Sequence, residues 1–154
     1  MRDERGSALI EVAGLAPLLL IPVLYLVLTL HRAEQAHLAA GTGARDAARA
    51  YATAPTTDDA RSWSHAAVKT AFADQGLPGA KLDVTFAREP GATCREASVT
   101  APALRPGDAV LVCITAVVAL PFADRGIVRG VFPAGLTLRA KAVAVVDDHR
   151  ADPP

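Results

Sequence analysis

A long apolar segment that contains one acidic residue constrains this chain more than any other feature. The 22 residues from Leu9 to Leu30 carry a single charge, on Glu11. A helix of this length covers the roughly 30 Å hydrocarbon core of a bilayer. An acid inside a membrane helix costs about 2.5–3.5 kcal/mol on insertion scales and usually faces protein, water or an opposite charge. The sequence therefore predicts a transmembrane helix in which Glu11 has a function.

The charged start of the chain, Met1 to Gly6, has three interpretations. A secretory signal peptide has an apolar stretch of about 7–15 residues, which is shorter than this one. A plain membrane anchor fits the length but leaves Glu11 unexplained. A leader cleaved after Gly6 explains both residues, because Ser7 becomes a free amino terminus, Glu11 becomes the fifth residue of the mature chain, and the apolar helix is kept.

Three stretches, in order, resemble the type IV prepilins and, among them, the TadE-like pseudopilins of the tight-adherence (Tad) pilus system. The resemblance covers residues 5 to about 52. Val12 stands where the family often has an aromatic residue, and Ala47 replaces a frequent glycine. The matching stretches are Arg5-Gly6-Ser7-Ala8-Leu9-Ile10-Glu11-Val12-Ala13, then Pro17 with Leu18-Leu19-Leu20-Ile21, and then Ala44-Arg45-Asp46-Ala47-Ala48-Arg49-Ala50.

The resemblance implies a minor, pilin-like structural component of a Tad pilus assembly system. A prepilin peptidase on the cytoplasmic side would cut between Gly6 and Ser7, and the chain would stay in the membrane before joining or priming the pilus. The amino terminus would then be cytoplasmic and the carboxyl-terminal domain extracytoplasmic. Glu11 would pair with the amino terminus of an adjacent subunit, and the partners would be the membrane, the peptidase, other pilins and Tad assembly proteins. The alternative is a single-pass membrane-anchored extracytoplasmic binding domain that is not incorporated in a filament.

Composition and motifs argue against other classes of function. The formal net charge is zero, so no basic excess points to nucleic acid. Phosphate-loop, Rossmann and zincin motifs are missing, so we expect no cofactor, no bound metal and no small-molecule substrate. Ser62, Ser64 and His65 lack a nucleophile elbow, and we do not expect an enzyme. An anchored hydrolase remains a third hypothesis, which an ester or peptide activity screen would test.

We predict an α+β fold, with a long N-terminal transmembrane helix followed by a small pilin-like domain. That domain would hold one amphipathic helix and a mainly antiparallel three-stranded sheet. The expected division is a leader at 1–6, a transmembrane helix at 7–30, an extracytoplasmic helical stalk at 31–53, the α+β domain at 54–148 and a disordered tail at 149–154.

The long helix has several notable positions. Pro17 and Pro22 each remove a backbone donor, so we expect either a bend or a repair by neighbouring groups. Gly41 and Gly43 predict a hinge or local fraying. A stripe of mostly small residues at intervals of three or four predicts close packing of another element: Ala33, Ala36, Ala40, Ala44, Ala47 and Tyr51.

Within the domain, Asp58 or Asp59 can cap a helix that ends at Gly76. Its apolar face is expected to hold Trp63, Ala67, Val68, Ala71 and Phe72. Alternation predicts half-buried strands at 81–87 and 136–147, and a β-branched run predicts a central strand at 109–120. Residues 121–135 have helical spacing and would cover the sheet edge or rest on the membrane surface.

Cys94 and Cys113 are an even pair in a domain that the resemblance places outside the cytoplasm, which favours a disulfide. The bond would close a loop of about 20 residues and contribute roughly 3 kcal/mol in the chain-entropy model. Two unpaired thiols are the alternative. Metal binding is not expected, because the two cysteines lack paired C-x-x-C spacing.

Overall fold

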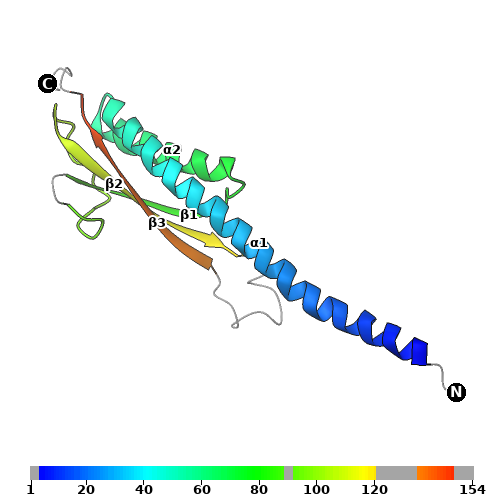
Figure 1. Ribbon diagram of the computed structural model, residues 1–154. Helices are drawn as coiled ribbons and strands as arrows, with labels where there is room; N and C mark the ends of the chain where they lie inside the picture. Colours follow the sequence, from blue (N-terminus) through cyan, green and yellow to red (C-terminus); the bar gives the residue numbers. More distant parts are fainter. Residues whose placement is uncertain (1–3, 89–91, 121–134, 148–154) are drawn as a thin grey trace.

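A computed structural model describes residues 4–88, 92–120 and 135–147, with side chains described from residue 14 onward. The elements follow in the order α1 (Glu4–Thr53), α2 (Thr57–Asp74), β1 (Lys81–Arg88), β2 (Ala109–Ala119) and β3 (Gly135–Val145). Figure 1 shows α1 extending far beyond a small domain, in which α1 and α2 lie on the sheet. The predicted α+β fold is confirmed. The helix predicted within 121–135 and the tail at 149–154 lie outside the described residues.

α1 is one continuous helix of 50 residues. It continues through Pro17 and Pro22, and it also continues through Gly41 and Gly43, so the predicted hinge or fraying at the glycines is wrong. The reason is a close helix contact. A Cβ atom added at Gly43 would lie 3.4 Å from the Cβ of Ala71 and 3.5 Å from the Cα of Val68, both in α2. The missing side chain at Gly43 lets the two helices approach.

The C-terminal part of α1 packs into the core through small side chains. The predicted stripe is buried at Ala36, Ala40, Ala44, Ala47 and Tyr51, and Ala39, Ala48 and Ala54 extend it. Small residues allow the backbone of α1 to lie near both α2 and the sheet. The buried face of α1 from residue 36 to its end, together with Ala54 just after it, is therefore part of the domain core.

The N-terminal cap of α2 and part of its buried face differ from the sequence prediction. The cap is Thr56 rather than Asp58 or Asp59: the Thr56 hydroxyl oxygen accepts a hydrogen bond from the Asp59 N–H at 3.1 Å. Trp63 is 45% exposed, so its predicted place on the core face is wrong. The buried positions are Ala60, Ser64, Val68, Ala71 and Phe72. Ser64 faces the core because its hydroxyl donates to the Ala47 carbonyl oxygen of α1 at 2.9 Å. The helix ends as predicted near Gly76, whose φ of 71° suits glycine.

The sheet has the strand order β1-β2-β3, and both pairs are antiparallel. β2 is the central strand and is apolar on both faces, as predicted. Alternation in β1 and β3 also matches the prediction, since one face carries the core residues and the other carries charged ones. The face toward the helices holds Val84, Phe86, Val110, Val112, Ile114, Ala116 and Val118.

The opposite face of the sheet is partly covered by the segment that follows β1. Ala92 and Ala97 pack against Ala87, Leu111 and Cys113, which form a second apolar cluster. Ser98 exchanges two backbone hydrogen bonds with Phe86, of 2.8 and 2.9 Å. This short bridge holds the segment beside the outer edge of β1.

Candidate functional site

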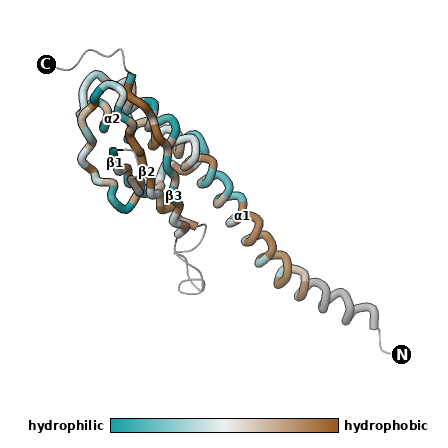
Figure 2. The backbone as a smooth tube through the Cα atoms, turned by 60° about the vertical axis from the view of Figure 1, so that its left-hand side comes forward, coloured by the Kyte–Doolittle hydropathy of each residue, from teal (hydrophilic) through white to brown (hydrophobic). Residues whose placement is uncertain are grey.

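The N-terminal half of α1 leaves the domain as an exposed apolar helix. Its large apolar side chains between Leu15 and Leu30 are 40–73% exposed, and the most apolar window of the helix is not buried by the domain at all. In Figure 2 this part of α1 is brown and lies apart from the sheet. A surface of this size is far larger than the apolar patches of soluble monomers. The helix thus fits a single-pass membrane anchor.

The three residues predicted to act in processing and pairing lie at the start of this helix. Gly6, Ser7 and Glu11 fall within α1, which begins at Glu4. Ser7 and Glu11 are four residues apart, about one helical turn. The pairing role of Glu11 stays a prediction.

The end of the apolar segment is marked by polar side chains at the point where α1 enters the domain. The Thr29 hydroxyl donates to backbone carbonyl oxygens one turn back, at 3.0 Å to Tyr25 and 2.8 Å to Leu26. One turn further on, His31 Nε2 and Gln35 Nε2 lie 3.0 Å apart. Ala36, the next buried alanine, already belongs to the core. Anchor and domain are thus joined by one continuous helix with a short polar border.

The two cysteines lie at disulfide-bonding distance. The Sγ atoms of Cys94 and Cys113 are 1.98 Å apart, and the Cα atoms are 5.7 Å apart. Cys113 sits in the middle of β2 on the face away from the helices, while Cys94 lies in the covering segment. The pair therefore connects that segment to the central strand.

Buried Tyr51 anchors the far end of α1, a contact that sequence reasoning did not find. Its hydroxyl donates to the Pro102 carbonyl oxygen, and its ring centroid lies 5.2 Å from that of Phe86. Burial raises the pKa of Tyr51 to about 12, and the Arg88 charge acts in the opposite direction. The small-residue stripe indicated that Tyr51 faces inward, but its partner is 51 positions away and no local pattern identifies it.

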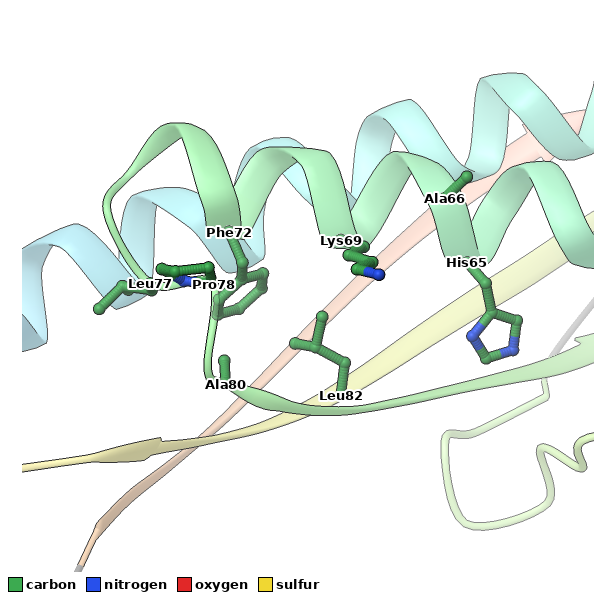
Figure 3. A pocket seen from close by; sticks show the side chains of 8 residues that line it. All are labelled: His65, Ala66, Lys69, Phe72, Leu77, Pro78, Ala80 and Leu82. Carbon is green, nitrogen blue, oxygen red and sulfur yellow. The ribbon is translucent and has the colours of Figure 1, made fainter.

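A hollow of about 360 Å³ lies between α2 and β1. Figure 3 shows Phe72, Leu77 and Leu82 around it, with His65 and Lys69 on the α2 side. The structure does not bring Ser64 and His65 together, because Ser64 is buried against α1 and His65 lines the hollow. Among the described residues, no group of three or more His, Cys, Asp or Glu side chains could hold a metal ion. The hollow gives no support to the hydrolase hypothesis.

Comparison with known proteins locates the similarity at the anchor. Residues 6–49 match the family model described as TadE-like protein. No curated protein and no solved structure matches the chain. The matched range begins at Gly6, contains the whole apolar segment and ends within the part of α1 that packs against α2. The resemblance predicted from the sequence is thus confirmed for this range.

Proposed function

Because residues 6–49 match the TadE-like family, we propose that this chain is a pseudopilin-like component of a Tad pilus assembly system. A prepilin peptidase cuts it after Gly6, and the apolar half of α1 then holds it in the membrane. The domain lies on the extracytoplasmic side. From there the mature chain joins or primes the pilus.

One observation supports this proposal most strongly. The family match begins at the proposed cleavage glycine and continues into a helix whose apolar half the domain leaves exposed. A structural subunit needs a helix that can exchange lipid for neighbouring helices, and a helix already buried in its own domain cannot do so. A long continuous α1 also transmits its position in the membrane directly to the domain, since no hinge separates them.

Processing is the first test. Co-expression with the matching prepilin peptidase should give a mature chain of 148 residues (154 minus 6) that begins at Ser7. Gly6→Leu should block the cut, because a bulky side chain would occupy the site next to the scissile bond. Gly14→Leu is the matched control, since a Cβ atom there meets nothing within 4 Å and the variant should be processed normally. Intact mass and amino-terminal sequencing give the result.

An intact Met1, found while the same peptidase processes another substrate, would contradict the proposed function. The chain would then be better described by the alternative, an anchored extracytoplasmic binding domain outside any filament.

A further inference from the structure

The outer edge of β3 has unpaired backbone groups over most of its length. β3 is an edge strand, and Val146 just after it faces β2, since its N–H donates to the Asp108 carbonyl oxygen at 2.9 Å. Backbone groups alternate sides along an antiparallel strand. The odd-numbered residues of β3 therefore direct their N–H and C=O groups away from the sheet, and none has a backbone partner within the described residues. Beyond Gly135, where the strand begins, they are Thr137, Arg139, Lys141, Val143 and Val145.

Both faces of β3 are incompletely covered at this edge. The side chains of these five residues are exposed, and those of Ala140, Ala142 and Ala144 are half-buried beneath α1. An added strand would continue the sheet and complete the burial of these alanines. The opposite edge is different, because Ser98 already bridges to Phe86 in β1.

The exposed side chains along this edge change from basic to apolar toward the end of β3. Arg139 and Lys141 are neighbours on the exposed face and form no salt bridge within the described residues. In the register, Asp83 shares a row with Arg139 but lies two strands away, beyond Thr115. Val143 and Val145 follow, 53% and 61% exposed. The edge is therefore basic in its middle and apolar toward its end.

We propose that β3 accepts an extended strand from a partner protein, with acidic side chains opposite Arg139 and Lys141 and apolar side chains opposite Val143 and Val145. Backbone hydrogen bonds to the outward groups supply affinity in this mode of recognition, and the side-chain pairs supply selectivity. The proposal does not depend on entry of the chain into a filament.

A second copy of the chain fits this edge poorly. Figure 1 shows β3 and α1 running in the same general direction, from the anchor toward the far end of the domain. Two β3 strands that paired antiparallel would therefore direct their anchors to opposite sides. β3 holds no acidic residue, so a second copy paired through its own β3 in either direction places no carboxylate opposite Arg139 and Lys141. The basic residues thus select a different, acidic strand.

Amide exchange of the full-length protein in detergent micelles tests the proposal. The probes are two nine-residue synthetic peptides of valine and threonine that differ at two alternate positions, which hold glutamate in one and lysine in the other. At ten times its Kd, the glutamate peptide should slow exchange of the five outward amides by about tenfold. The lysine peptide should leave them unchanged.

Two substitutions of Lys141 distinguish the contribution of its backbone N–H from that of its side-chain charge. Lys141→Pro removes one outward N–H and leaves the β2–β3 hydrogen bonds in place, because proline is tolerated where an edge amide faces solvent. It should abolish protection of the neighbouring Arg139 and Val143 amides. Lys141→Ala keeps the amide, so the pattern of protection should remain while the affinity for the glutamate peptide falls. Four outcomes would each overturn the proposal. The first two are no protection at all and equal protection by both peptides. The other two are protection confined to β1 and protection that rises with protein concentration alone.

Discussion

At the scale of single residues, two buried hydroxyl groups each have a specific backbone partner. Ser64 and Tyr51 are both fully buried, and both donate hydroxyl hydrogen bonds to backbone carbonyl oxygens. Buried polar atoms without partners are costly, so these bonds fix which elements meet. Ser64 joins α2 to α1, and Tyr51 joins α1 to the segment that precedes β2.

Tyr51→Phe should reveal both the hydrogen bond and the raised pKa. Near neutral pH the variant should lose about 0.5–1.5 kcal/mol of unfolding free energy, because the Pro102 carbonyl oxygen loses its donor. Between pH 10 and pH 12 an unfolded tyrosine loses its proton while folded Tyr51 keeps it, since its pKa is about 12. Stability from this group is therefore complete below pH 10 and declines as the pH rises through 12. Thermal unfolding in micelles at pH 8 and pH 11 should show the difference between wild type and variant shrinking. A difference that does not change with pH would contradict this explanation.

At the scale of elements, α1 and α2 pack directly against each other. This contact depends on Gly43, where a Cβ atom would reach Ala71 and Val68, whereas Gly41, two residues earlier, has open space. The same helix thus provides a test position and a matched control.

Gly43→Leu should lower the unfolding free energy by about 1–3 kcal/mol, since a large side chain overpacks the helix contact. Gly41→Leu should be neutral or stabilising by up to about 1 kcal/mol, because leucine is the better helix former and a Cβ atom at this position meets nothing within 4 Å. Chemical denaturation of the two variants in parallel measures the difference. Equal stabilities would show that α1 and α2 do not pack as closely as described.

The link between Cys94 and Cys113 is a second element-scale test. In freshly isolated membranes, an alkylating mass tag should label neither cysteine until the denatured protein is reduced. Cys94→Ser should lower the unfolding free energy by about 2–5 kcal/mol, the usual range for a small exported domain, because the covering segment is then no longer tied to β2. Labelling of both thiols without reductant would contradict the bond.

At the scale of the whole molecule, the anchor, the strands and the strand faces could be predicted from the sequence. Their signals are local: an apolar run, alternation in 81–87, and β-branched residues in 109–120. The errors arose where tertiary contacts decide. The sequence predicts a hinge at Gly43 because its contact with α2 is not visible in the local sequence. It predicts a buried Trp63 because periodicity does not show which side of an apolar stripe a neighbouring element covers.

The site divides in the same way. Gly6 and Glu11 stand out because a leader and a lone acid are visible in the sequence, and their roles stay predictions within the range 6–49 that matches the family model. The Tyr51–Pro102 contact and the open edge of β3 could not, since each requires knowing which distant segments meet and which edge remains unpaired. Local sequence features thus indicate the candidate residues of the membrane segment. The contacts and the open strand edge of the domain become visible only in the fold.

Pilus formation in cells that carry Glu11→Ala is the most direct test of the proposed role. After cleavage, Ser7 bears an ammonium group, and pairing of the Glu11 carboxylate with the amino terminus of a neighbour would remove an uncompensated charge from the membrane, which otherwise costs several kcal/mol. Glu11→Ala should keep membrane insertion and cleavage after Gly6 but lose co-purification of partner pilins and support of pilus formation. Glu11→Gln separates charge from size. The account predicts few or no pili in Glu11→Ala cells at matched protein level. Normal piliation with normal co-purification of partners would contradict it.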